Sequence, residues 1–207
     1  MPKKRRNKVK ALKSRLHVFC EGTRTEPNYF NGYIEMKFAG SRLVCVEKSV
    51  KNDPVKLVQV AVKAKAENPA GDIFWVVYDR ESVNEESNNK HDQAHQLAQS
   101  HDINIAISNV CFEVWLLLHF QKTAAAYSNY TDLIKRSRLT RHIKGYEKGA
   151  KISFSSLQMC EARKNAKTIN SQTKMAAEPS WTKPYQWNPY TNVYQLLDAI
   201  DAFMSVC

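Results

Sequence analysis

The stretch Ile73–Tyr78 reads IFWVVY and is followed at once by Asp79-Arg80-Glu81. An unbroken apolar and aromatic run of this length is typical of a central parallel strand that helices cover on both faces. Arg15–Cys20 and Ile103–Ile107 are less strongly apolar runs of the same kind, and polar residues follow each of them. These three runs predict a parallel sheet with polar side chains beyond the carboxyl ends of its strands.

Helical patterns alternate with these strands. A fourth strand is expected at Leu43–Val46, and apolar residues recur at helical spacing after Thr25, after the Asp53-Pro54 cap, over His91–Ser100 and over Phe112–Phe120. The alternation predicts an α/β fold with a mainly parallel sheet flanked by helices.

The strand pattern stops after Lys122. Residues 129–177 are polar, basic and helical in pattern, and a terminal helix presents Val193, Leu196 and Ile200 on one face. We therefore expect three parts: a disordered basic arm over 1–14, the α/β core over 15–121, and a helical, basic C-terminal lobe over 122–207 that packs on the core.

The overall composition excludes several classes of protein. The chain has 207 residues, and no apolar run approaches the roughly 20 residues that cross a bilayer. The basic N-terminus lacks the apolar segment of a secretory signal. Five cysteines without a C-x-x-C pair argue against a disulfide framework and a cysteine-rich zinc site. These features favour a cytoplasmic protein without membrane contacts.

The net charge of +11 is unevenly distributed. Residues 1–15 carry +8 and residues 122–174 carry +9, whereas the rest of the chain carries −6. Basic segments attract phosphate backbones, and acidic residues next to them would repel those backbones unless metal ions neutralise the carboxylates. The pattern favours a metal-dependent enzyme that acts on nucleic acid; the alternative is a solvated tail and a basic helical surface.

Carboxylates follow two of the buried strands. Glu21 follows the first, and Asp79 and Glu81 follow the strongest; in an extended chain the last two point to the same side and Arg80 to the other. Carboxyl ends of parallel strands meet at one crevice, where Mg²⁺ or Mn²⁺ is the natural counter-charge for oxygen ligands. Alone, each of these signals is more typical of a turn or a helix cap. Together, on separate buried strands, they make a metal site as good an interpretation as a structural one.

Other polar residues have competing interpretations. Ser108 and Asn109 follow the fourth strand of the chain and are expected to line the same crevice. Glu113 either lies in the site or faces solvent in a first helical turn. His91 and His95 have a metal-like spacing, but a polar exposed helix face is the simpler interpretation. His17 and His119 lie in apolar runs and are expected to be packed. Four aromatic residues could stack on bases, but a packed loop is the favoured interpretation: Trp181, Tyr185, Trp187 and Tyr190.

Four motifs together resemble the RloB-like family. They are EGTRTEPNYF from Glu21, Asp79-Arg80-Glu81, ISNVCFEVWLLLHF from Ile107, and NPYTNV from Asn188. The resemblance covers nearly all of the chain beyond the basic arm. Members of this family are bacterial proteins encoded near restriction–modification genes or beside an ATPase in abortive-infection systems, and they belong with Toprim-type metal-binding domains.

The resemblance implies roles for individual residues. Glu21 matches the Toprim glutamate, Asp79 and Glu81 match the acidic pair, and Glu26 resembles a second glutamate of the nuclease branch. The usual pair is Asp-x-Asp, so Asp-x-Glu leaves the geometry of a metal open. Together with the residue patterns, this implies a catalytic set of Glu21, Glu26, Asp79, Glu81, Asn109 and Glu113, of which Glu21, Asp79 and Glu81 would bind the metal.

The leading hypothesis is a Mg²⁺- or Mn²⁺-dependent Toprim-type nuclease of bacterial anti-phage defence. RNA, tRNA in particular, is preferred as its substrate over DNA, and an ATPase is a candidate partner. Basic residues of the C-terminal lobe would hold the phosphates: Lys135, Arg136, Arg138, Arg141 and Lys144. The rival hypothesis is a non-catalytic subunit that binds nucleic acid or an ATPase, and a nucleotidyl transferase is a third. The oligomeric state does not follow from the sequence.

Overall fold

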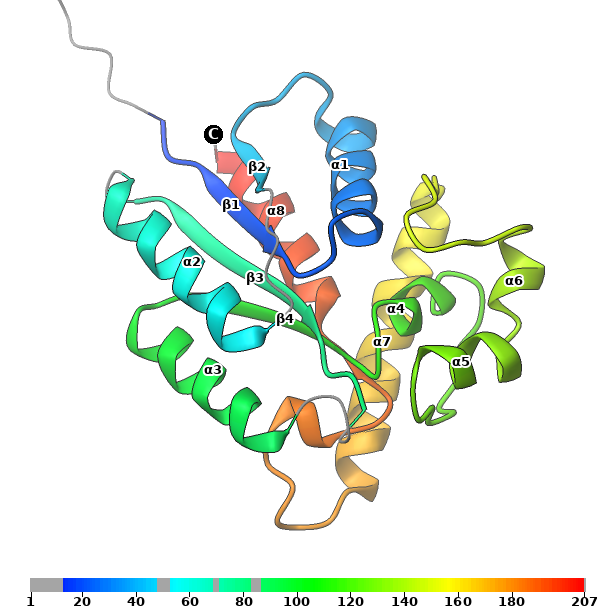
Figure 1. Ribbon diagram of the computed structural model, residues 1–207. Coiled ribbons are helices and arrows are strands. Elements are labelled where there is room, and N and C mark those ends of the chain that lie inside the picture. The colour runs from blue at the N-terminus through cyan, green and yellow to red at the C-terminus, as the bar shows by residue number, and fades with distance from the viewer. Residues whose placement is uncertain (1–12, 48–52, 69–70, 83–86, 207) are drawn as a thin grey trace, which may run out of the picture.

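The computed structural model describes residues 13–47, 53–68, 71–82 and 87–206. A five-stranded sheet in the order β2-β1-β3-β4-β5 forms its centre (Figure 1). The first four strands are parallel, and β5 is antiparallel to β4. The fold class is the predicted mixed α/β fold with a mainly parallel sheet flanked by helices.

The elements follow the predicted alternation, with ends that shift by a few residues. The strands are β1 Leu16–Cys20, β2 Val44–Glu47, β3 Ile73–Asp79, β4 Asn104–Asn109 and β5 Tyr190–Thr191. The helices of the first half are α1 Thr25–Phe38, α2 Pro54–Glu67, α3 Asn88–Ser100 and α4 Glu113–Leu117. Those of the second half are α5 Tyr130–Arg136, α6 Leu139–His142, α7 Ser156–Ala176, the 3₁₀ helix η1 Pro184–Gln186 and α8 Val193–Val206.

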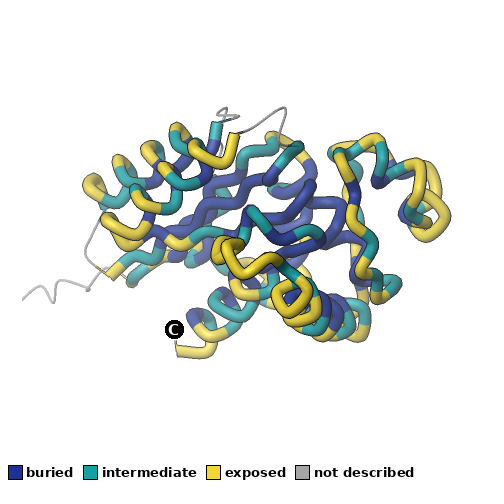
Figure 2. The backbone as a smooth tube through the Cα atoms, turned by 90° about the horizontal axis from the view of Figure 1, so that it is seen from below, coloured by how far each residue is buried: buried dark blue, intermediate teal, exposed yellow. Residues whose placement is uncertain are grey.

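Helices cover both faces of the sheet, as the apolar β3 requires. Trp75 and Val77 face a core shared with α1, α4, α7 and α8, whereas Phe74 and Val76 face α2 and α3. The strands therefore form a buried layer between exposed helical surfaces (Figure 2). Alternation along a pleated strand produces this two-sided burial.

The C-terminal segment is not purely helical, contrary to the expectation that strands end before Lys122. Tyr190 and Thr191 pair with Asn109 and Ser108 as the outermost strand of the sheet. The strand was missed because two residues carry no alternating pattern. One core cluster also contains residues from both sides of position 122, for example Leu116 and Leu196.

Side-chain amides fasten this last strand. Asn170 of α7 donates to the Thr191 carbonyl at 2.8 Å and accepts from the Thr191 N–H at 3.1 Å. Asn192 accepts from the Ile107 N–H at 2.7 Å and donates to the Ile105 carbonyl at 2.9 Å. The NPYTNV motif thus attaches α8 to the open side of β4.

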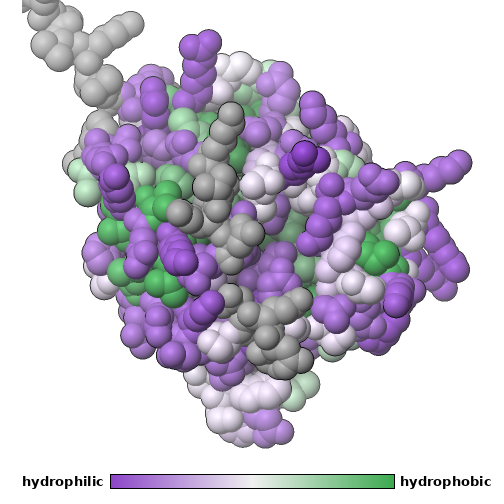
Figure 3. Space-filling model, in the orientation of Figure 1, coloured by the Kyte–Doolittle hydropathy of each residue, from purple (hydrophilic) through white to green (hydrophobic). Residues whose placement is uncertain are grey.

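One face of the molecule is mainly hydrophilic (Figure 3). Hydrophilic side chains cover most of the face visible in Figure 3, and apolar ones gather in small patches. Among the described residues, no helix has both the length and the apolar character needed to span a membrane. Most of the predicted basic arm, residues 1–12, lies outside the described residues.

Candidate active site

A cavity of about 760 Å³ lies at the carboxyl ends of β1 and β3. Five carboxylates and two basic side chains line it, together with backbone and small polar groups. The charged lining residues are Glu21, Glu26, Asp79, Glu81, Glu113, Arg24 and Lys148. The five carboxylates that the sequence singled out therefore meet in one place.

Glu21 and Asp79 are held by the ends of neighbouring strands. The backbone N–H of Glu21 donates to the Val77 carbonyl at 2.8 Å and so continues the pairing of β1 with β3. The Glu21 Oε2 atom accepts the backbone N–H of Asp79 at 2.9 Å. This contact fixes one carboxylate against the backbone of the other, and Asp79 is only 8% exposed.

Glu81 reaches the same cavity by a backbone turn. Its φ of +57° is left-handed, so the extended geometry assumed from the sequence does not hold there. Its N–H nevertheless donates to the Val110 carbonyl at 2.9 Å. Arg80 points the other way, as predicted: its Nε donates to the Tyr185 carbonyl at 2.9 Å, and the residue is 3% exposed.

Glu26 and Glu113 enter from the first turns of two helices. Glu26 lies at the start of α1 and Glu113 begins α4, and both are buried. The Tyr146 hydroxyl donates to Glu113 Oε1 at 2.6 Å. Of the two interpretations that the sequence left open for Glu113, the structure supports the buried position in the site.

The carboxylates repel one another in this confined space. Burial, followed by the charges of Glu26 and Glu113, raises the pKa of Asp79 well above its usual range, and Glu21 and Glu81 add to the shift. Burial is also the main reason that the pKa of Glu26 is raised. The cavity therefore favours protons or cations near these oxygens.

Lys148 is, with Arg24, one of two described basic residues that line the cavity, and sequence reasoning assigned neither to the site. Burial lowers its pKa, but the charges of Glu113 and Asp79 outweigh that effect and raise the pKa overall. Its Nζ lies 4.4 Å from the centre of the Tyr130 ring. Lys148 lies in an irregular loop whose sequence has no hydrophobic pattern. The glycine that follows it, Gly149, indicates a turn but does not indicate that Lys148 lies in the site.

The Lys148 loop is attached to α1. The Gly149 N–H donates to Thr25 Oγ1 at 2.8 Å, and the Asn28 amide donates to the Gly149 carbonyl at 2.8 Å. The same helix that carries Glu26 therefore positions Lys148, more than a hundred residues later in the chain.

Ser108 and Asn109, which were expected to line the site, do not line this cavity. Ser108 Oγ is hydrogen-bonded to Thr191 Oγ1 at 2.9 Å. The Asn109 amide donates to the carbonyls of Tyr185 and Trp187 on the side of α3 and η1. Successive residues of a strand face opposite ways, and here both side chains hold the C-terminal segment.

The basic residues predicted to contact phosphates lie outside the cavity as well. Lys135, Arg136, Arg138, Arg141 and Lys144 are all exposed, on or next to α5 and α6. In Figure 1 these helices lie beyond the carboxyl ends of the strands. Arg136 is also bound to Asp132 at 2.8 Å. Their role toward nucleic acid stays a prediction.

Two histidines that the sequence singled out, His91 and His119, are buried, the first against expectation. His91, predicted on an exposed helix face, is fully buried and stacks between Tyr78 and Tyr185. His119 is buried, as expected, and is hydrogen-bonded to Tyr29 at 3.0 Å. The tryptophan- and tyrosine-rich loop is mostly packed, with Trp181 alone of its four ring residues classed as exposed.

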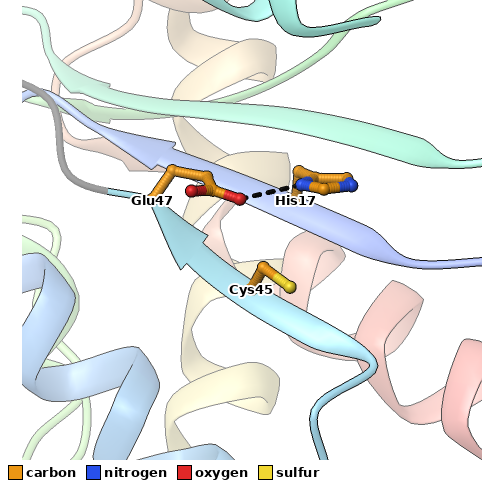
Figure 4. A group of neighbouring side chains, drawn as sticks. All are labelled: His17, Cys45 and Glu47. Atoms are coloured by element: carbon orange, nitrogen blue, oxygen red, sulfur yellow. Dashed lines mark hydrogen bonds and ion pairs between the residues drawn. The ribbon is translucent and has the colours of Figure 1, made fainter. Parts of the chain in front are cut away.

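His17 is buried as well, but it belongs to a polar group. His17, Cys45 and Glu47 form a group that could hold a metal ion (Figure 4), in which one potential ligand atom from each lies within 4.8 Å of the others. This group lies on β1 and β2, away from the carboxylate cavity, and the sequence analysis did not identify it.

The carboxylate cavity suits a hard divalent cation. Its acidic lining offers only oxygen donors, which Mg²⁺ and Mn²⁺ prefer. Burial first, and then the charges of the neighbouring carboxylates, raise the pKa of Asp79. Among the described residues, Arg24 and Lys148 are the basic side chains that line the cavity. Glu21, Asp79 and Glu81 therefore fit the metal-binding role that the sequence assigns to them, and that role stays a prediction.

Comparisons with known proteins agree with the resemblance seen in the motifs. A family model described as RloB-like protein matches residues 16–200. Neither the curated proteins nor the solved structures yielded a match. The matched range includes every charged residue that lines the cavity.

Proposed function

The chain belongs to the RloB-like family, and from that premise we propose that it is a metal-dependent nuclease. The observation that supports this most strongly is the convergence of five carboxylates and Lys148 on one cavity. Three of those carboxylates are nearly buried, which is costly unless a cation binds there. Stability alone gives no reason to gather them.

Each residue has a chemical role in this proposal. Glu21, Asp79 and Glu81 hold Mg²⁺ or Mn²⁺, which when bound supplies charge stabilisation for a phosphoryl group and activation of water. Glu26 orients the attacking water by accepting its hydrogen bond. Lys148, on the exposed side of the site, contacts the phosphate, and Tyr146 keeps Glu113 in place.

The substrate we propose is RNA, and tRNA in particular. The exposed basic residues around α5 and α6 would bind phosphates on either side of the scissile one. We further propose that the protein acts in the bacterial cytoplasm as an anti-phage effector together with an ATPase. These assignments rest on the family and on the charge distribution.

Cleavage assays test the proposal directly. The purified chain is incubated with total tRNA, single-stranded RNA and duplex DNA, each with Mg²⁺, Mn²⁺ or EDTA. We expect cleavage of tRNA that requires metal and is lost in Glu21→Gln. The matched control is Glu35→Gln, because Glu35 is an exposed glutamate of α1 outside the cavity.

Metal binding can be measured even if the isolated chain needs a partner protein for cleavage. Calorimetric titration with Mn²⁺ should show binding that Glu21→Gln weakens and Glu35→Gln does not. Cleavage that persists in Glu21→Gln would overturn the assignment. Nucleic-acid binding that persists in EDTA, with neither cleavage nor Mn²⁺ binding, would establish the rival binding subunit.

A further inference from the structure

A second metal site, of different chemistry, is indicated at the edge of the sheet. His17 of β1 lies directly across from Cys45 of β2, and Phe19 pairs with Glu47 two positions on. The side chains of His17, Cys45 and Glu47 lie on one face and come together (Figure 4). Nitrogen, sulfur and carboxylate oxygen are the ligand types that Zn²⁺ combines in proteins.

Each ring nitrogen of His17 faces a carboxylate oxygen. Nε2 lies 2.9 Å from Asp72 Oδ2, and Nδ1 lies 2.8 Å from Glu47 Oε1. An ionised carboxylate accepts hydrogen bonds and donates none. With Nε2–H donated to Asp72, Nδ1 can face Glu47 only if a second proton or a metal ion lies between them.

Asp72 is placed as the supporting carboxylate of a metal-bound histidine. Its side chain is 3% exposed, and its Oδ1 accepts the Arg15 N–H at 2.9 Å, which leaves Oδ2 for His17. A histidine that binds a metal commonly donates its other ring N–H to such a carboxylate. The His17 ring also stacks on Phe74, with centroids 4.8 Å apart and planes 5° apart. Both contacts fix the ring orientation.

We propose that His17 Nδ1, Cys45 Sγ and Glu47 bind one Zn²⁺ ion, with water as the fourth ligand. Tetrahedral nitrogen and oxygen ligands about 2.1 Å from zinc stand roughly 3.4 Å apart. The 2.8 Å contact would therefore open by a few tenths of an ångström while Cys45 moves inward. Cys45 and Glu47 are half-buried, so both side chains have room for that adjustment.

This zinc would serve the fold and not the cleavage site. His17 lies on β1 and Glu21 directly follows that strand, four positions later, which places the two sites on the order of 13 Å apart. The ion would bind β2 to β1, and Asp72 would connect both to the start of β3. The inference does not depend on the proposed nuclease activity.

Co²⁺ substitution tests this site separately from the carboxylate cavity. A cobalt–thiolate bond gives a charge-transfer absorption in the near ultraviolet that an all-oxygen site cannot give. The untagged, metal-stripped full chain is titrated with Co²⁺, and Zn²⁺ is then added to displace it. We expect one equivalent of thiolate-bound Co²⁺ in the native chain and in Cys160→Ser, and none in Cys45→Ser. Cys160 is the matched control because it is an exposed cysteine on α7.

The supporting carboxylate has its own test. Asp72→Asn should keep the absorption and weaken Zn²⁺ affinity about 10- to 100-fold, as measured by competition with a chromophoric chelator. Zn²⁺ should also raise the melting temperature of the native chain and of Cys160→Ser more than that of Cys45→Ser. The proposal is overturned if the native chain shows no thiolate absorption, or if Cys45→Ser retains it.

Discussion

Gly22 is the residue that allows Glu26 to approach the strand end. A Cβ atom at position 22 would overlap the Glu26 carboxylate. Because the overlapping atoms are the far end of a flexible side chain, the backbone need not move and only the carboxylate must leave. Glycine at this position is therefore required for the position of the Glu26 carboxylate and not for the backbone conformation.

We expect Gly22→Ala to lower the proposed cleavage rate by about 100-fold, since displacing a catalytic group by about 1 Å has effects of that size. Its free energy of unfolding should change by less than about 1 kcal/mol. The control is Gly32→Ala, where the nearest atom to an added Cβ, the Ile152 carbonyl oxygen, is 3.9 Å away. An unchanged rate in Gly22→Ala would mean that the position of Glu26 is unimportant.

Asp79 is an acidic residue that is buried next to other carboxylates. Burial and the neighbouring carboxylates raise its pKa above the unfolded value. The native state then binds more protons than the unfolded state, so this residue's contribution to stability is present at low pH and is lost as pH rises through the native pKa.

Asp79→Asn should therefore stabilise the metal-free fold, by about 0.5–2 kcal/mol, while abolishing cleavage. The gain should grow as pH rises above the usual aspartate pKa and should level off above the raised native pKa. Urea unfolding in EDTA measures it, and Mg²⁺ should reduce the difference by stabilising the native chain. A destabilised Asp79→Asn at high pH would show that the carboxylates are already compensated without a cation.

At the scale of elements, the carboxylates were predictable because each directly follows a strand or opens a helix. Glu21 and Asp79 end buried strands, and parallel topology brings such ends together. Asn109 was predicted to line the site, but its side chain contacts the Trp187 carbonyl outside the cavity. The sequence does not reveal to which face of β4 this side chain points. Lys148 was missed because an irregular loop has no periodicity, and its attachment to α1 is a long-range contact.

The loop that carries Lys148 depends on its glycines. Gly149 has a φ of +89°, and an added Cβ would lie 2.8 Å from Arg24 Cβ. Gly145 has a φ of +70°, but no described atom outside its chain neighbours lies within 4 Å of such a Cβ. The two positions therefore separate backbone strain from steric conflict.

Gly149→Ala is expected to destabilise the fold by about 1–3 kcal/mol and to reduce cleavage by moving Lys148. Gly145→Ala should have the smaller effect on both, because it carries the backbone strain alone. Chemical denaturation and the tRNA assay measure the pair. Equal effects of the two substitutions would show that the contact with Arg24 does not position the loop.

For the whole molecule, the C-terminal segment completes the sheet. The Asn192 side chain makes the hydrogen bonds to Ile107 and Ile105 of β4 that a neighbouring strand would otherwise make. The bond to the Ile107 N–H is buried. Asn192→Ala should cost about 1–3 kcal/mol in unfolding free energy, since the N–H loses its acceptor. Asn104→Ala, at the exposed start of the same strand, removes a 3.2 Å donation to the Phe74 carbonyl but buries no unpaired group, and should cost less than about 1 kcal/mol. Similar losses in both variants would contradict this role.

The late position of β5 has a consequence for how the protein is made. Every acidic residue of the site emerges from the ribosome before Lys148, and Lys148 emerges before the strand and helix that cover β4. Pairing between segments so distant in sequence waits until most of the chain has been synthesised. We expect nascent chains that end before Trp187 to be digested readily by added protease, unlike the released protein. An interrupted translation product would then be removed by cellular proteolysis, and the proposed cleavage activity would arise only after β5 and α8 have been synthesised.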